Sequence, residues 1–305
     1  MKTSFEPYQA KSIMFRNEEP DGFLRGRYSV NPYMGCSMGC RYCGIQEKKY
    51  NSSAALEERK DSVVRMKINA PYLLEKRLES EEPERGLIVM GESCEPYDRP
   101  EEKYLITRNL MEILSRYDYP LHIMTKSPLI LRDLDILRDY SSRNFLSVTV
   151  SVPLQSREMA GKFEAEAPPV KERFRTVRSL RKAGITCGID VSPLIPYISD
   201  GEEAFRVLKR AAACGASYVV FSPLSIKPYK RDMFFAWLSE KYPRLIGPYE
   251  RLYGEGETPD ADYVRKFSQK FIRRAEELKL RTSFPFSEGE EFGYRQDFLR
   301  LHGTG

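Results

Sequence analysis

The chain has 305 residues, of which 41% are hydrophobic and 30% are charged, a composition ordinary for a soluble globular protein built as one large domain or as one barrel with extensions. It has neither an apolar run of membrane length nor the start of a secretory leader, so we expect a cytoplasmic protein without membrane contact. The excess of 49 Lys and Arg over 44 Asp and Glu is too small to indicate nucleic-acid binding unless the charge is localised.

The N-terminal part is predicted to be an extended lead-in followed by a short strand. Residues 1–27 are polar and mixed in character, and we expect them to lie over the rest of the fold. Residues 28–30, Tyr-Ser-Val, have the character of a short β-strand. The most informative stretch of the sequence follows this strand directly.

Three cysteines, Cys36, Cys40 and Cys43, lie on a loop that also contains Gly35 and Gly39. Thiolates are the ligands of iron–sulfur clusters, and a four-iron cluster usually takes four of them. Three thiolates would leave one iron open to a substrate or cofactor. A catalytic zinc keeps one coordination position open in the same way. The glycines let the backbone fold tightly around such a cluster.

Disulfides, a structural zinc and unrelated free thiols are the other interpretations of this loop. Disulfides are not expected in a chain without a secretory signal. Zinc would need a fourth ligand, and the two histidines, His122 and His302, are far away in sequence. The spacing therefore favours an iron–sulfur cluster.

Apolar segments that read as strands alternate with amphipathic helices from residue 54 to residue 224. The predicted strands cover residues 63–68, 86–90, 121–125, 145–150, 185–191 and 218–221. The predicted helices cover residues 54–59, a segment starting at 69–71, and residues 105–115, 129–140, 170–183 and 202–214. This alternation indicates parallel βαβ units, whose active sites lie at the carboxyl ends of the strands.

The pattern changes after residue 224. A basic segment with an aromatic residue in its middle comes first and consists of Lys227, Tyr229, Lys230 and Arg231. Helices are predicted at 233–238 and 262–280, and the chain from 284 onward reads as a loosely ordered cover. The expected organisation is thus a lead-in (1–27), a barrel (28–224) and a mostly helical C-terminal extension (225–305).

The cysteine loop, with Tyr42 before its last cysteine, resembles the Cys-x3-Cys-x2-Cys signature of the radical S-adenosylmethionine (SAM) superfamily. More narrowly, Asn31-Pro32-Tyr33-Met34-Gly35 is similar to the spore photoproduct lyase-like, or DNA repair photolyase-like, branch. Four further segments share this similarity: Glu95-Pro96-Tyr97, Thr125-Lys126-Ser127, Ala183-Gly184-Ile185 and Ser192-Pro193-Leu194-Ile195-Pro196. The resemblance runs from about residue 28 to about residue 280, and it implies an open, six-unit partial (β/α)6 barrel of the TIM type.

The resemblance also implies the chemistry. Cys36, Cys40 and Cys43 would hold a [4Fe–4S] cluster whose open iron is chelated by SAM. One electron, delivered by an external donor of the flavodoxin or ferredoxin type, would cleave SAM to methionine and a 5′-deoxyadenosyl radical that takes hydrogen from a substrate. We expect a monomer acting on nucleic acid, either a damaged pyrimidine in DNA or an RNA base. The alternatives are a radical SAM enzyme modifying a protein, peptide or small metabolite, and a non-catalytic iron–sulfur protein.

Several residues match family positions that contact SAM. Tyr42 would pack near the adenine, Glu92 between Gly91 and Ser93 would receive the amino group, and Lys126 and Ser151 would meet the carboxylate. Ser192 would shape the pocket near the adenosine. The alternatives are a tyrosine that packs on the barrel, a surface glutamate and a solvated lysine.

Cys94 is the candidate hydrogen donor to a substrate radical. Spore photoproduct lyases carry their donor cysteine two positions earlier, where this chain has Glu92, so repair of thymine dimers does not follow from the resemblance. A small buried cysteine is the alternative for Cys94, and Cys187 and Cys214 are expected in the core. The residues assigned to substrate binding, through phosphate contacts or base stacking, are Tyr97, Lys227, Tyr229, Lys230 and Arg231.

Overall fold

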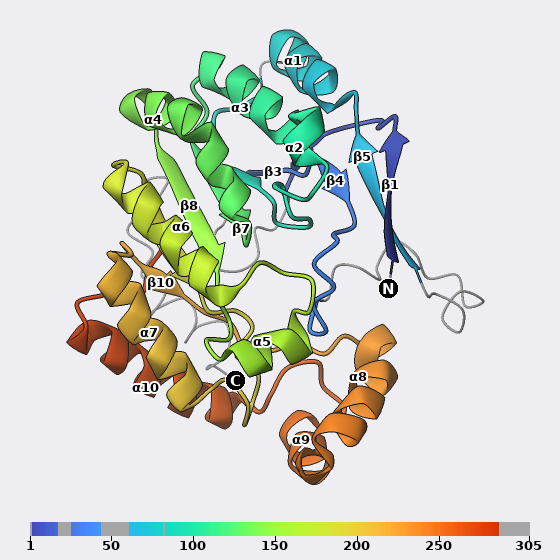
Figure 1. Cartoon of the computed structure of the whole chain (residues 1–305), viewed down its shortest axis with the longest axis vertical. Coiled ribbons are helices and arrows are strands. Elements are labelled where there is room, and N and C mark those ends of the chain that lie inside the picture. Colours follow the sequence, from blue (N-terminus) through green and yellow to red (C-terminus); the bar gives the residue numbers. More distant parts are fainter. Residues whose placement is uncertain (1, 18–25, 44–60, 82, 287–305) are drawn as a thin grey trace.

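The fold is built on a seven-stranded sheet. A computed structural model describes residues 2–17, 26–43, 61–81 and 83–286 (Figure 1). The strand order is β10-β9-β8-β7-β6-β3-β2. Strands β3 and β6 to β10 pair in parallel, and β2 pairs antiparallel with β3. The strands are β2 (Met14–Arg16), β3 (Tyr28–Val30), β6 (Ile88–Met90), β7 (Leu121–Thr125), β8 (Leu146–Ser151), β9 (Thr186–Asp190) and β10 (Val219–Val220). The predicted partial barrel with six parallel strands is confirmed.

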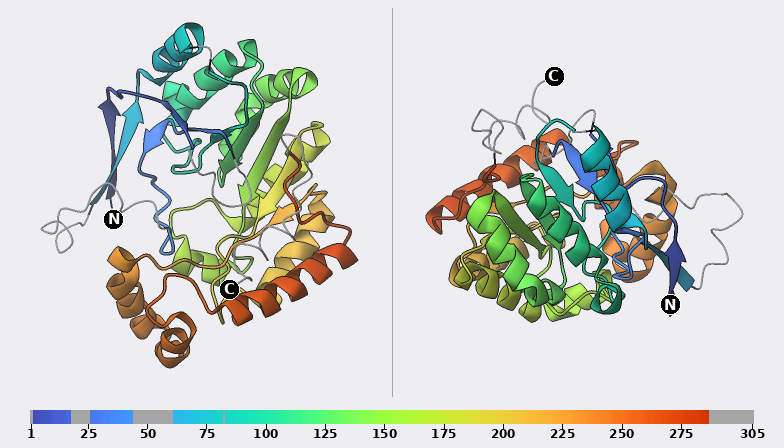
Figure 2. Two further views of the ribbon diagram at one scale, coloured as in Figure 1. Left: turned by 180° about the vertical axis from the view of Figure 1, so that it is seen from behind. Right: turned by 90° about the horizontal axis from the view of Figure 1, so that it is seen from above.

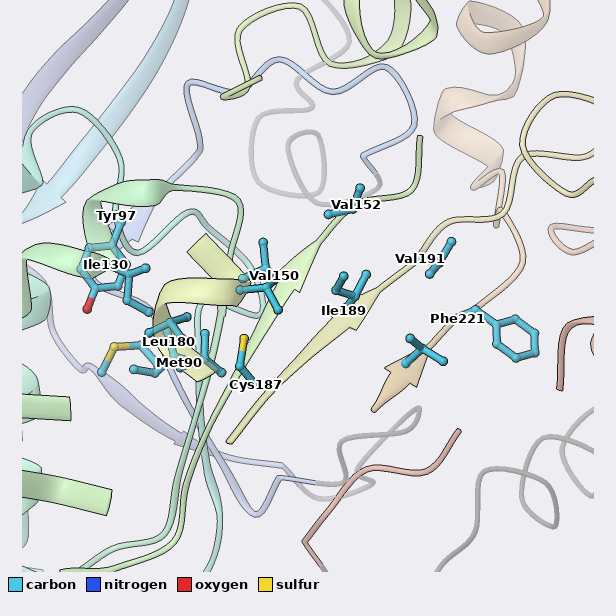
Figure 3. Packing of buried hydrophobic residues seen from close by; sticks show 14 of the residues in the cluster. Met90, Tyr97, Ile130, Val150, Val152, Leu180, Cys187, Ile189, Val191 and Phe221 are labelled. Atoms are coloured by element: carbon cyan, nitrogen blue, oxygen red, sulfur yellow. The ribbon is translucent and has the colours of Figure 1, made fainter. Parts of the chain in front are cut away.

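Helices cover the outer face of this sheet, as the views in Figures 1 and 2 show. They are α1 (Ala70–Glu81), α3 (Ile106–Arg116), α4 (Leu134–Arg143), α6 (Val170–Lys182) and α7 (Glu202–Cys214). All six residues of β8 are buried, as expected for a parallel strand covered on both faces. Val150 and Ile189 lie side by side on the neighbouring strands β8 and β9 in the main core (Figure 3).

Most predicted elements are confirmed with shifted ends, and some were missed. The expected helix at 129–140 begins as a 3-10 helix (Pro128–Asp133) before α4. The strand expected at 63–68 exists as β5 (Asp61–Lys67), but it belongs to a separate small sheet with β1 (Lys2–Tyr8) and β4 (Tyr33–Met34). The expected lead-in thus contributes the strands β1 and β2. The helix expected at 54–59 lies outside the described residues.

The C-terminal extension is helical, as predicted. It contains α8 (Pro228–Lys241), a 3-10 turn (Pro243–Leu245), α9 (Ile246–Tyr253) and α10 (Ala261–Glu277). Asp260 caps α10 by accepting the backbone N–H groups of Asp262 and Tyr263 at 3.0 and 3.1 Å. The helix α9 and two short helices earlier in the chain, α2 (Glu101–Tyr104) and α5 (Arg157–Phe163), were not predicted.

The chain beyond α10 returns to the sheet and packs on the face opposite the main core. Val219 of β10 donates its N–H to the carbonyl of Arg281 at 2.8 Å. Phe284 is buried and meets His122 and Tyr218 edge to face, with ring centroids 4.7 and 5.8 Å apart. Burial lowers the pKa of His122 to about 3, so this ring is neutral. The prediction of a loose cover is therefore wrong at Phe284, and residues 287–305 lie outside the described residues.

We expect Phe284→Ala to lower the free energy of unfolding by about 3–5 kcal/mol, because it removes a buried ring and leaves a cavity against His122 and Tyr218. Urea denaturation followed by circular dichroism measures this change. Tyr72→Ala, at a side chain that is 64% exposed, is the control and should change stability by about 0.5 kcal/mol or less. Equal effects of the two substitutions would contradict this packing role.

Candidate functional site

A cavity of about 330 Å³ lies at the carboxyl ends of the parallel strands. Its walls come from the cysteine loop and from the segments that follow strands β6 to β10. Most of the residues predicted from the sequence line it together: Cys36, Cys40, Tyr42, Cys43, Gly91, Glu92, Ser93, Cys94, Lys126, Ser151, Ser192 and Lys227. The fold thus gathers into one cavity side chains that are up to 191 positions apart in sequence, from Cys36 to Lys227.

The cysteine loop is held in a tight, irregular conformation. Gly35 has a φ of +89°, and a Cβ there would lie 2.9 Å from the carbonyl oxygen of Val63, so the position requires glycine. Below the loop, the buried carboxylate of Asp98 accepts the backbone N–H of Ser37 at 2.8 Å and the Ser37 hydroxyl at 2.5 Å. Asp98 was not predicted from the sequence, because no spacing rule links it to the loop.

The donor set of the loop fits an iron–sulfur cluster. Burial raises the pKa of the Cys36 thiol, and it raises that of Cys40 to about 11, so an iron centre would be needed to hold these sulfurs as thiolates. Among the residues that the structure describes, no three His, Cys, Asp or Glu side chains are arranged around a single metal ion. The thiolates of a cluster bind different irons, so they need not converge on one point.

The segment after β6 lines a second wall of the cavity. Gly91 has a φ of +90°, and a Cβ there would lie 2.5 Å from the carbonyl oxygen of Met124, so the close approach of β6 to the end of β7 requires glycine. Ser93 donates its N–H to the side-chain oxygen of Asn31 at 2.9 Å. Glu92 lines the cavity and is exposed, so its carboxylate is accessible.

Cys94 lines the cavity as well, with its sulfur 3.6 Å from the side-chain oxygen of Asn31. Burial raises the pKa of Cys94 to about 12, so the thiol keeps its hydrogen at neutral pH. The geometry and the protonation state are those that a hydrogen donor would need.

Glu95 connects two strand ends beneath the cavity. Its carboxylate accepts the Thr125 hydroxyl, the N–H of Lys126 at 2.8 Å and the N–H of Tyr97 at 3.0 Å. Burial raises the pKa of Glu95, although these three hydrogen bonds each act to lower it. From the segment after β6, the Glu95 side chain thus reaches the end of β7.

Lys126 and Ser151, which were predicted separately as SAM contacts, are hydrogen-bonded to each other. The Lys126 ammonium donates to the Ser151 hydroxyl at 3.0 Å. Burial alone would lower the pKa of Lys126, but the neighbouring Cys40 and Glu164 raise it overall, so the amine stays charged. A fixed cation with a hydroxyl beside it can bind a carboxylate.

Sequence reasoning missed Asp190, which ends β9 and lines the same cavity. Burial raises the pKa of Asp190 to about 6, while the Ser192 N–H, which donates to it at 2.8 Å, acts to lower it. Its position at the carboxyl end of a predicted parallel strand was a signal that could have found it.

The residues assigned to substrate binding do not gather at the cavity as the others do. The Tyr97 side chain lies in the main core (Figure 3), and its hydroxyl is 3.8 Å from the sulfur of Met111. Lys230 donates to the Cys43 carbonyl, and Arg231 donates to the Gly254 and Gly256 carbonyls. Lys227 lines the cavity but pairs with Glu257, and Tyr229 also has contacts with its own chain. The assignment of these residues to substrate stays a prediction.

The fold and the cysteine loop define the class of the protein: the chain belongs to the radical SAM superfamily, and it is an enzyme of that superfamily. Residues 30–209 match the family described as the Radical SAM superfamily.

No helix among the described residues has the length and apolar character needed to cross a membrane.

Two uncharacterized proteins are similar to this chain over most of its length. The chain is 30% identical over 231 residues to an uncharacterized protein of Mycobacterium tuberculosis, covering 75% of this chain and 68% of that protein. It is 26% identical over 219 residues to an uncharacterized protein of Methanocaldococcus jannaschii, covering 71% of this chain and 77% of that protein.

Among solved structures, the fold is similar to that of a spore photoproduct lyase mutant with bound AdoMet and dinucleoside spore photoproduct. The TM-score is 0.64 at 15% identity, over 90% of this chain and 79% of that one. The fold is also similar to that of SuiB of Streptococcus suis bound to precursor peptide SuiA. The TM-score is 0.53 at 13% identity, over 84% of this chain and 47% of that one. Identities this low establish the shared fold alone.

We expect Cys40→Ala to abolish both the cluster and SAM cleavage, because two thiolates do not hold a four-iron cluster. Iron and sulfide content, the visible absorbance of the reconstituted protein and 5′-deoxyadenosine formation measure the loss. Cys214→Ala, at a buried cysteine of α7 far from the loop in sequence, is the control and should keep the cluster. A Cys40→Ala protein that still cleaves SAM would show that the cysteine loop is not the cluster site.

Proposed function

We propose that this protein binds one [4Fe–4S] cluster through Cys36, Cys40 and Cys43, and that it reductively cleaves SAM to act on a substrate in the same cavity. The observation that carries this proposal is the convergence of the three thiols and the Lys126–Ser151 pair on one 330 Å³ cavity. When bound, the cluster supplies the electron for SAM cleavage, and with it a radical that takes hydrogen from the substrate. An external flavodoxin- or ferredoxin-type protein would deliver that electron.

The chain's own residues hold SAM in this proposal. The Lys126 ammonium and the Ser151 hydroxyl bind the methionyl carboxylate, and Glu92 receives the amino group. Tyr42 and Ser192 line the part of the cavity where the adenosine would lie. The retained set of SAM contacts supports an enzyme over a non-catalytic iron–sulfur protein.

Nucleic acid is the substrate that we propose first, as a damaged DNA pyrimidine or an RNA base. The support is the spore photoproduct lyase fold, which is known with a bound dinucleoside photoproduct. In this chain the hydrogen donor would be Cys94, because position 92, where the lyases have their cysteine, is glutamate. The thiol would give its hydrogen atom to a substrate radical and become a thiyl radical. An electron from the external donor with a proton, or a hydrogen atom taken back from 5′-deoxyadenosine, would restore the thiol.

A peptide or small-molecule substrate is the second candidate, and a specific observation favours it. The cations of the basic segment, Lys227, Lys230 and Arg231, contact groups of the protein itself. A phosphate would have to replace those contacts to bind there. The similar fold of SuiB with its precursor peptide bound supports the same alternative.

We expect Cys94→Ala to keep uncoupled SAM cleavage while turnover of the substrate falls or its products change, since the cluster and the SAM contacts are untouched. Anaerobic assays of 5′-deoxyadenosine and of substrate products measure the two separately. Cys214→Ala is again the matched control. Unaltered turnover and products in Cys94→Ala would reduce Cys94 to a packing residue.

The substrate class is tested with the reconstituted, dithionite-reduced protein. We expect 5′-deoxyadenosine to form from SAM, and a dinucleotide photoproduct or bulk RNA to increase its rate or yield a product. A known radical SAM enzyme run in parallel checks the assay. Stimulation by peptides with none by either nucleic acid would favour the second candidate. A cluster that forms without any SAM cleavage would contradict the proposed function.

A further inference from the structure

A buried carboxylate behind the cavity joins two residues of its wall. Glu164 directly follows α5 and is only 2% exposed. The Tyr42 hydroxyl donates to its Oε1, and the Lys126 ammonium lies 3.9 Å from the same oxygen. The Arg173 guanidinium of α6 pairs with its Oε2 at 2.8 Å. Side chains from the cysteine loop, the end of β7 and α6 therefore meet at one group.

Arg173 places a buried positive charge beside this carboxylate. The guanidinium is itself 1% exposed, and it is fixed by the Pro168 carbonyl at 2.8 Å and the Ser151 carbonyl at 3.2 Å. A buried charge without an opposite charge beside it is strongly unfavourable. Because Arg173 occupies Oε2, Oε1 is left to Tyr42 and Lys126.

The two oxygens of Glu164 therefore have separate partners. The pair with Arg173 joins α5 to α6, and by itself it would be a contribution to fold stability. The contacts at Oε1 go to two residues that line the cavity. Without a negative charge at Oε1, the hydrogen bond from the Tyr42 hydroxyl would weaken, and Lys126 would lose the anion opposite its contact with Ser151.

We propose that Glu164 is a positioning residue for SAM binding: its carboxylate fixes the Tyr42 ring and the Lys126 ammonium in the orientation that the bound ligand requires. This inference rests on the proposed function, which makes the cavity the SAM site. Preorganised ligand-binding groups need such a supporting contact, and its loss weakens binding even though Glu164 does not touch the ligand.

The test compares Glu164→Gln with Glu166→Gln in the reconstituted full chain. Glu166 is two residues away and pairs with Arg99 at 2.9 Å on the surface, which makes it a matched control. Anaerobic titration calorimetry with SAM measures Kd, and 5′-deoxyadenosine formation gives KM for SAM and kcat. We expect Glu164→Gln to raise Kd and KM about tenfold or more with a smaller change in kcat, and Glu166→Gln to match the wild type.

Two further variants keep the test decisive. Glu164→Asp should recover part of the SAM affinity, because the charge is kept on a shorter side chain. Tyr42→Phe removes only the hydroxyl that Glu164 holds; it should weaken SAM binding, and it should add little when combined with Glu164→Gln. If Glu164→Gln does not fold, the SAM affinities of the Tyr42→Phe and Glu164→Asp proteins decide whether Glu164 is a positioning residue.

A lower melting temperature of Glu164→Gln with wild-type Kd and KM for SAM would overturn this inference, because Glu164 would then act on stability alone. A wild-type protein that binds SAM and forms no 5′-deoxyadenosine would contradict the proposed function, while the Kd comparison would still decide the role of Glu164. A wild-type protein that does not bind SAM would overturn both.

Discussion

The cysteine loop depends on buried carboxylates for its position, because it has no regular hydrogen-bonded structure of its own. Asp98 accepts the Ser37 N–H and hydroxyl at one end of the loop, and Glu164 accepts the Tyr42 hydroxyl at the other. Glu95 holds the adjoining wall by joining the segment after β6 to the end of β7. The helices and strands fix where these acids lie, and the acids fix the loop.

This arrangement has an energetic cost that the fold must offset. A carboxylate buried without partners is strongly unfavourable, and breaking a buried ion pair typically costs about 3–5 kcal/mol. Arg173 offsets the cost of burying Glu164, whereas Glu95 relies on hydrogen-bond donors. Burial raises the pKa of Glu95. Buried polar groups of this kind add less to stability than apolar residues of the same size would. Their role around the cavity is better explained by the geometry they impose on its walls.

The barrel and the cysteine loop at its cavity could be predicted from the sequence, because both leave local signals. Apolar runs separated by amphipathic helices mark parallel strands, and a loop of three cysteines at short spacing needs no distant partner to be recognised. Cys94 and Lys126 follow strands and Ser151 ends one, so their meeting at the cavity follows from topology. Asp98, Glu164 and Arg173 could not be found in this way, because their roles depend on contacts between residues 61, 122 and 9 positions apart that no local pattern encodes. The packing of Phe284 against the barrel was missed for the same reason.

The substrate is equally hard to predict from the sequence, because it also depends on contacts between distant residues. A cluster of cations in the sequence suggests a phosphate site only while its partners are unknown, and here the partners are the Glu257 carboxylate and three backbone carbonyls. A cation already bound to a carbonyl gains less from a phosphate than a solvated one, because the carbonyl must be released and hydrated. Charge localisation in the sequence is therefore weak support for a nucleic-acid surface in this chain. Under the proposed function, the choice between nucleic acid and peptide turns on the chemistry at Cys94 and on what the cavity would accept beside SAM.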